Sequence, residues 1–107
     1  MTTTELQAAL HLEAVTQGCE AREITDWYVG DLLSHVMSRV KPGSAWITIL
    51  CDLNVVAVAR LTGVACVILA EGAEAAPAVI ARAEEQGVIL YRSARSAYAL
   101  CRAQALL

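Results

Sequence analysis

Apolar residues recur along this chain in short blocks of two kinds. Three blocks are almost continuously apolar: 45–50, 65–70 and 88–91. Runs of this length are typical of strands in a sheet that is covered on both faces, because neither side of such a strand meets solvent. We therefore predict central strands at these three positions. The more polar segment 22–25 is a candidate for a first strand.

The segments between these blocks place their apolar residues at helical spacing. In 31–40, apolar side chains stand at positions i, i+3, i+4 and i+7, and Lys41-Pro42-Gly43 closes the helix because proline cannot continue it. A helix over 54–62 ends at Gly63, and another runs from Pro77 to Gly87. Ser93 or Ser96 caps the last helix, whose buried stripe is expected to be Ala97, Tyr98 and Cys101.

The N-terminal segment also has a helical pattern. Thr4 is a suitable N-cap, and Gly18 is a suitable stop for a helix over 4–17. Its apolar face would contain Leu6, Ala9, Leu10 and Ala14.

After residue 30 the predicted order is helix, strand, helix, strand, helix, strand, helix. Such alternation with short connections indicates βαβ units and a largely parallel sheet. The chain has 107 residues, which is enough for one domain and hardly for two. We predict an α/β fold: a single three-layer α/β/α domain with a mostly parallel sheet, preceded by an N-terminal helix within 1–20.

Composition adds an expectation about assembly. Hydrophobic residues make up 57% of the chain, against about 45–50% in an ordinary soluble domain. No apolar run approaches the ~20 residues of a membrane span, and the first residues lack the pattern of a signal peptide. We expect a cytoplasmic protein without membrane contact, whose surplus apolar surface forms a homodimer.

Charge and cysteine content exclude other classes of function. The net charge is −3, and the basic residues are scattered, so nucleic-acid binding is not expected. The four cysteines, at positions 19, 51, 66 and 101, form no close pair, and neither histidine stands at metal-ligand spacing from them. We expect structural thiols, with Cys66 in the core, and neither metal nor cofactor.

Polar residues follow the predicted strands at the edge where a parallel sheet binds ligands. The loops that begin at Cys51, Ala70 and Arg92 each reach this edge. The candidate ligand-binding residues are Asp52, Asn54, Glu71, Gly72 and Ser93. Asp52 and Asn54 are also good helix caps, so capping alone is the competing interpretation.

A second candidate constellation is Asp31 with His35. Asp31 is placed to cap its helix, and a carboxylate and an imidazole four residues apart could form an acid–base pair. The alternative is a helix cap followed by an ordinary histidine. Phosphate-loop, dinucleotide-binding and nucleophile-elbow motifs are all missing, so we do not expect an enzyme.

Three stretches together resemble the DRTGG domain family: "YVGDLLSHVMSRVKPGSAWITILCDLNVVAVARL", "ACVILAEG" and "VILYRSARSAY". The resemblance extends over 23–107. It implies a small α/β/α domain that pairs with itself and has a regulatory role inside larger proteins, including some pyrophosphatases and phosphate acetyltransferases. It also implies similarity to the N-terminal domain of the kinase/phosphorylase that modifies the histidine-containing phosphocarrier protein.

Stand-alone copies resembling this chain occur near genes of iron-only hydrogenases and redox complexes, which suggests a redox-enzyme or regulatory protein as partner. The elements that give the family its name are altered here. Asp52-Leu53-Asn54 stands in place of the Asp-Arg element, and Ala70-Glu71-Gly72 in place of Thr-Gly-Gly. Loss of the arginine removes an obvious anion-binding side chain.

From these observations we predict a non-catalytic regulatory or adaptor domain. It would sense a small ligand, such as a nucleotide or another phosphate compound, or dock on a partner. The alternatives are a purely structural interaction module without a ligand and a small enzyme that uses Asp31 and His35.

Overall fold

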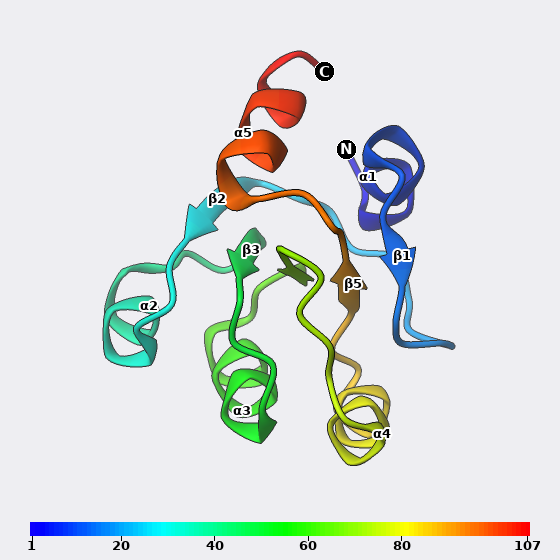
Figure 1. Cartoon of the computed structure of the whole chain (residues 1–107). Helices are drawn as coiled ribbons and strands as arrows, with labels where there is room; N and C mark the ends of the chain where they lie inside the picture. Colours follow the sequence, from blue (N-terminus) through cyan, green and yellow to red (C-terminus); the bar gives the residue numbers. More distant parts are fainter.

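The structure is a computed structural model that describes all 107 residues. A five-stranded sheet with the order β1-β5-β4-β3-β2 forms its centre (Figure 1). The strands are β1 (Glu13–Ala14), β2 (Asp26–Val29), β3 (Ser44–Thr48), β4 (Cys66–Leu69) and β5 (Leu90–Arg92). Strands β2 to β5 are parallel to one another, and β1 pairs antiparallel with β5.

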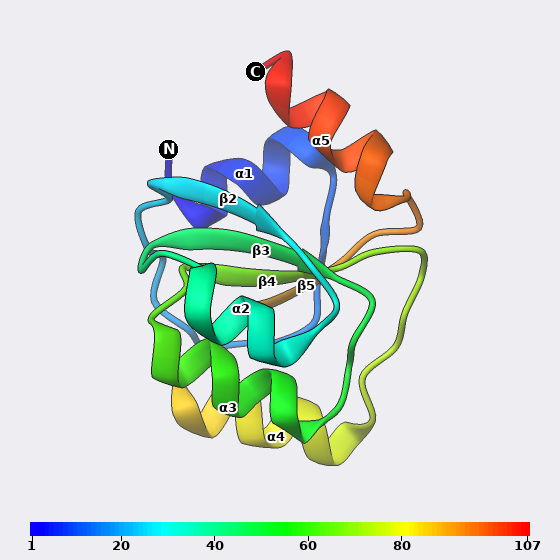
Figure 2. The ribbon, with the colours of Figure 1, turned by 90° about the vertical axis from the view of Figure 1, so that its left-hand side faces the viewer.

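Helices cover both faces of the sheet. They are α1 (Thr3–Leu10), α2 (Leu33–Arg39), α3 (Leu53–Thr62), α4 (Pro77–Gln86) and α5 (Ala97–Ala105). Helices α2, α3 and α4 lie side by side on one face, and α1 and α5 lie on the other (Figures 1 and 2). The predicted three-layer α/β/α architecture is therefore confirmed. None of these helices is both long and apolar enough to cross a membrane.

The core has two parts because the sheet is covered on both faces. All five residues of β3 are buried, and their side chains alternate between the two parts. Trp46 packs in the cluster under α2, α3 and α4, whereas Ala45 and Ile47 pack in the cluster under α1 and α5. This arrangement explains the continuous apolar runs and confirms the three predicted central strands.

Several helix limits also agree with the predictions. Pro77 begins α4, and Gly87 ends it in the left-handed conformation. Gly63 ends α3 in the same way. The hydroxyl of Ser96 accepts a hydrogen bond from the Ala99 amide, so Ser96 is the cap of α5.

The predicted N-terminal helix over 4–17 is wrong in both limits. Its cap is Thr2, which forms a capping box with Glu5, so Thr4 lies inside the helix. The helix ends at Leu10, and residues 13–16 pair with β5 instead. The amide of the buried residue Leu90 donates to the Thr16 hydroxyl at 3.0 Å. The need of a buried strand edge for hydrogen-bond partners outweighs the local helical pattern.

The predicted first strand at 22–25 is displaced: β2 begins at Asp26. Residues 22–24 instead hydrogen-bond to the start of the chain, through the Ile24 amide to the Met1 carbonyl and the Thr3 amide to the Arg22 carbonyl. The strand that pairs with β3 contains Trp27 and Tyr28, both half-buried.

Two details of the helix faces are wrong as well. Tyr98, predicted in the buried stripe of α5, is 71% exposed, and Leu100 is the buried residue. Met37 on α2 is 49% exposed, while Val36 beside it is fully buried. The exposed apolar side chains leave both helical layers with apolar surface that this chain does not cover.

Candidate functional site

The loops that follow β2, β3, β4 and β5 meet at one edge of the sheet, because these strands are parallel. We call this edge the rim. The candidate residues on the rim fall into three groups with different surroundings. The first group follows β2, the second follows β3, and the third follows β4 and β5.

Asp31 follows β2 and fixes the end of β3. Its Oδ1 accepts hydrogen bonds from the Thr48 hydroxyl at 2.8 Å and from the Ile49 amide at 2.9 Å. The N-cap of α2 is Leu32, and no side chain caps that helix, so the predicted capping role of Asp31 is wrong. His35 is exposed and shares no hydrogen bond or ion pair with Asp31. The acid–base pair is therefore not assembled in this conformation.

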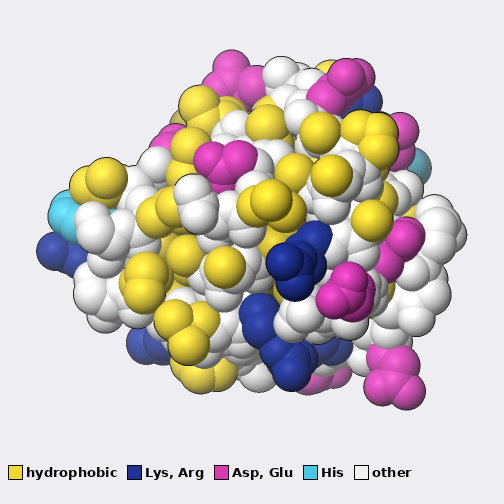
Figure 3. All heavy atoms as spheres, turned by 90° about the horizontal axis from the view of Figure 1, so that it is seen from below, with side chains coloured by type: hydrophobic (Ala, Val, Ile, Leu, Met, Phe, Trp, Pro, Cys, Tyr) yellow, Lys and Arg dark blue, Asp and Glu magenta, His cyan; other side chains and the backbone are white.

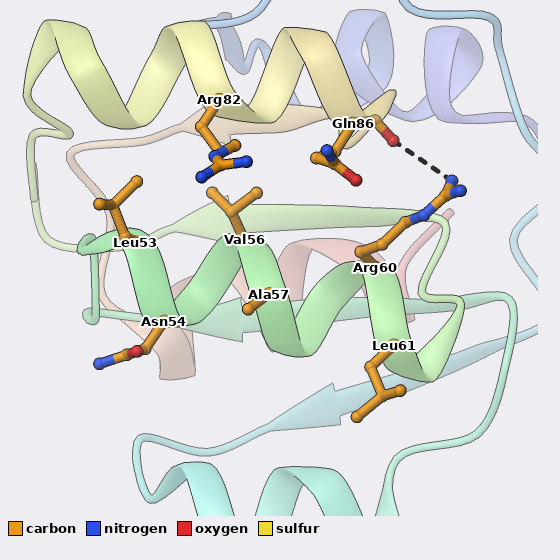
Figure 4. Close-up of a pocket in the computed structure, with 8 residues that line it drawn as sticks. All are labelled: Leu53, Asn54, Val56, Ala57, Arg60, Leu61, Arg82 and Gln86. Carbon is orange, nitrogen blue, oxygen red and sulfur yellow. Dashed lines mark hydrogen bonds between the residues drawn. The ribbon is translucent and has the colours of Figure 1, made fainter.

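Asp52 and Asn54 lie at the start of α3. Oδ1 of Asp52 accepts a hydrogen bond from the Asn54 amide at 3.0 Å, which confirms Asp52 as the helix cap. The Asn54 side chain is exposed and makes no hydrogen bond within the chain. It lines a groove between α3 and α4 on the outside of the helical layer (Figure 4).

Glu71, Gly72 and Ser93 form the third group. Glu71 and Gly72 both have positive φ angles, 57° and 70°. This turn brings the Gly72 amide to the Ser93 carbonyl and the Glu71 amide to the Arg95 carbonyl, each at 2.8 Å. The loops after β4 and β5 are thus tied together by backbone hydrogen bonds.

Beside these two loops lies a hollow of about 360 Å³, which we call the β5 hollow. Its lining comes from the end of α1, the start of β1 and both loops: Leu10, His11, Glu13, Gly72, Arg92, Ser93, Ala94 and Arg95. Of the predicted site residues, Gly72 and Ser93 line it and Glu71 adjoins it, whereas Asp52 and Asn54 do not. The structure therefore brings together the β4 and β5 parts of the predicted rim.

Arg92 organises the wall of the β5 hollow. Its Nε donates to the Ala73 carbonyl at 3.1 Å, and Nη2 donates to the Gly72 carbonyl at 2.8 Å. The guanidinium also forms ion pairs with Glu13 and Glu74, each at 3.0 Å. With four partners, Arg92 holds the loop after β4 against β1 and β5, and most of its donors are occupied.

Two further basic groups in the hollow have no such partners. Arg95 is exposed, and its side chain forms no ion pair. His11 is exposed at the end of α1 in the left-handed conformation. The cap of α5, Ser96, follows Arg95 directly, so the positive end of that helix dipole lies nearby. This combination suits an anion more than a cation.

His11, Arg92 and Arg95 were not among the residues predicted from the sequence. Arg92 interrupts an apolar strand block at its carboxyl end, and that interruption was an available signal. His11 could not be found from the sequence, because its segment was assigned to a longer helix.

The four cysteines are all free thiols and are not grouped around a metal site. No group of three or more histidine, cysteine or acidic side chains is positioned to hold a metal ion. Cys66 is 1% exposed, as predicted for a core residue, and burial raises the pKa of its thiol to about 12. A thiol in that state is not a nucleophile.

No family model and no curated protein matches the chain. A solved structure does match it: the CBS and DRTGG domains of the regulatory region of Clostridium perfringens pyrophosphatase, in complex with the activator diadenosine tetraphosphate. The TM-score is 0.73 at 12% sequence identity, and the match covers 94% of this chain and 44% of that chain. This chain has a DRTGG-like fold.

The two stretches that the resemblance placed at the family's name-giving elements lie in two different loops of this fold. Asp52-Leu53-Asn54 forms the start of α3, and Ala70-Glu71-Gly72 forms the turn after β4. At 12% identity the likeness to the pyrophosphatase region is one of fold. The resemblance read from residues 23–107 is confirmed at that level.

Proposed function

We propose that this chain is a non-catalytic regulatory domain that binds a small phosphate-bearing ligand, of the nucleotide class, in the β5 hollow. The observation that carries the proposal is that Arg95 and His11 both line a hollow of about 360 Å³. These basic side chains stand together in a chain whose net charge is −3. An unpaired guanidinium and an imidazole that line one concavity at strand ends are a suitable site for an anion.

The size and lining of the hollow support this ligand class. Ligand pockets commonly measure about 300–1,000 Å³, so the hollow suits a mononucleotide or part of a dinucleotide. Arg92 has its donors engaged by the loop and two carboxylates, which leaves Arg95 as the free guanidinium. The Ser93 hydroxyl accepts from the Arg95 amide at 3.1 Å and can still donate to a ligand.

The fold comparison supports a sensing role in place of catalysis. The Clostridium perfringens structure with this fold is a regulatory region bound to a dinucleotide activator. Among the predicted site residues, the proposal now rests on Gly72 and Ser93, with Glu71 beside them. Asp52 and Asn54 belong to the start of α3 and are not part of the proposed ligand site. The enzyme that uses Asp31 and His35 is not part of the proposal.

The proposal includes a homodimer formed through α5. Tyr98 on this helix and Leu106, its C-cap residue, are 71% and 84% exposed, and an apolar surface of this kind is typical of subunit contacts. A redox enzyme or a regulatory protein as the regulated partner stays a prediction from the resemblance, and a cytoplasmic location stays a prediction from the composition.

A thermal-shift screen tests the ligand proposal. Adenine and guanine mononucleotides, diadenosine tetraphosphate, pyrophosphate and acetyl phosphate would each be added to the purified chain. A ligand present at about a hundred times its Kd stabilises the folded state by about 2.7 kcal/mol, which raises the Tm of a domain this small by about 10 °C or more. We expect at least one nucleotide to do so.

The variant Arg95→Ala is expected to lose the shift, because it removes the free guanidinium without touching the core. Arg39→Ala, which removes an exposed arginine at the end of α2, is the matched control and should keep the shift. Absence of any shift across the panel, or an equal shift in Arg95→Ala, would contradict the proposal.

A further inference from the structure

A second concavity lies on the opposite helical layer, between α3 and α4, and nothing above assigns it a role. It measures about 570 Å³, and we call it the α3–α4 groove. Its lining residues are Leu53, Asn54, Val56, Ala57, Arg60, Leu61, Arg82 and Gln86 (Figure 4). The six from α3 recur at helical spacing over eight residue steps, so the groove is about 12 Å long, or two turns of a helix.

The apolar part of the groove is shaped to receive another helix. Val56 is buried at its base, and Ala57 beside it is small, which allows a close approach of a second backbone. Leu53 and Leu61 lie at opposite ends of α3, Leu53 pointing toward α4 and Leu61 away from it (Figure 4), and they are 49% and 72% exposed. Exposed leucines spaced along a two-turn groove are the usual receptor for an amphipathic helix.

The charged side chains that line the groove are all basic. Arg60 and Arg82 are its charged residues, and no carboxylate lines it. Nη1 of Arg60 donates to the Gln86 carbonyl at 3.4 Å, and Nη1 of Arg82 lies 3.9 Å from the exposed Glu85. Both guanidinium groups therefore keep donors available at the edge of the groove.

The surrounding surface continues the apolar part of the groove. Seen from the side of α2, α3 and α4, hydrophobic side chains gather over the middle of the layer, with Lys or Arg side chains beside them and several Asp or Glu side chains on the same face (Figure 3). On α2, Leu32 and Met37 are 57% and 49% exposed. Apolar surface next to basic groups attracts a partner that is apolar in the middle and acidic at its margin.

We propose that the α3–α4 groove docks a short amphipathic helix of another protein, with aspartate or glutamate beside its apolar residues. Charge complementarity selects this occupant over a second copy of the chain. Two copies placed groove to groove would bring four guanidinium groups into one interface, and like charges brought together there cost several kcal/mol. An acidic helix pairs with Arg60 and Arg82 and covers Leu53 and Leu61.

Two synthetic peptides of about 14 residues test this proposal on the full chain. Both carry leucines at i, i+3, i+4 and i+7, and the flanking positions are glutamate in one and lysine in the other. We expect the glutamate peptide to bind, with amide NMR shifts concentrated on α3 and α4, and its affinity to fall as salt is raised. Each of Arg60→Glu and Arg82→Glu should weaken binding about tenfold, whereas Arg39→Glu should leave it unchanged.

Far-UV circular dichroism would check that the charge-reversal variants are folded. With two separate variants, the test still stands if one of them does not fold. Equal binding of both peptides, no binding of the glutamate peptide, or wild-type affinity in both variants would overturn the proposal. So would a dimer in sedimentation that Leu61→Ser converts to a monomer, because the groove would then belong to a second copy.

Discussion

Arg92 is the side chain on which the loop after β4 depends. It joins the carbonyls of Gly72 and Ala73 to the carboxylates of Glu13 and Glu74 while only 29% of its side chain is exposed. The two carbonyl contacts matter more than the exposed ion pairs, because surface ion pairs contribute about 0–1 kcal/mol each, whereas hydrogen bonds that involve a charged group contribute about 1.5–3 kcal/mol.

We predict that Arg92→Ala lowers the free energy of unfolding by about 2–3 kcal/mol, because two carbonyls lose their charged donor. Urea unfolding measures the change. Arg82→Ala removes an exposed arginine with one long ion pair and should stay within about 0.5 kcal/mol of the wild type. Arg92→Lys should recover only part of the loss, because one ammonium cannot reach both carbonyls in the same fork geometry. Equal stability of the two alanine variants would refute this role.

At the residue scale, the sequence predicted roles that depend on neighbours in the chain. Asp52 as a helix cap and Cys66 as a core residue are confirmed. Asp31 was placed wrongly, because its partners, Thr48 and Ile49, come from a strand 17 and 18 residues away. Arg92 stood at a visible break in an apolar block, but its partners could not be predicted, since Glu13 is 79 residues away.

At the scale of elements, the turn from α2 into β3 is the tightest junction. Gly43 has a φ of 83°, its amide donates to the Gly63 carbonyl, and its carbonyl accepts from the Thr25 amide. A Cβ at this position would collide with Oγ1 of Thr25. The turn therefore requires glycine for its backbone angle and for its space.

We predict that Gly43→Ala is more destabilising than Gly87→Ala. Both residues have a positive φ, so each substitution costs about 1–2 kcal/mol of backbone strain. Gly87 has open space around it, whereas at Gly43 the collision with Thr25 should add about 1–3 kcal/mol. Urea unfolding of the two variants measures the difference. If the two variants lose the same free energy of unfolding, an alanine Cβ at position 43 does not collide with Thr25, and the steric argument is wrong.

Elements whose partners follow closely in the chain were predictable. The alternation from α2 to α5 was correct in order and type, because each strand is buried on both faces and each helix is closed by a local signal. The segments before residue 30 were not predictable, because β1 pairs with β5, more than 70 residues later. Nothing in the local pattern of 13–16 indicates that these residues pair with the edge of β5.

For the whole molecule, the parallel sheet gathers the loops after its strands along one rim, but the residues of these loops line two separate concavities. The sequence predicted one site from Asp52 to Ser93. The structure separates Asn54, on the α3–α4 groove, from Gly72 and Ser93, on the β5 hollow. The two concavities therefore differ in chemistry and lie on opposite helical layers.

The most direct test of the ligand claim is an amide NMR titration of the full chain with diadenosine tetraphosphate and with ATP. The account predicts saturable shifts at Gly72, Ser93 and Arg95, together with movement of the His11 signal, and no saturable shift on α3. Spectra that do not change with either compound, or shifts confined to residues outside the β5 hollow, would contradict it.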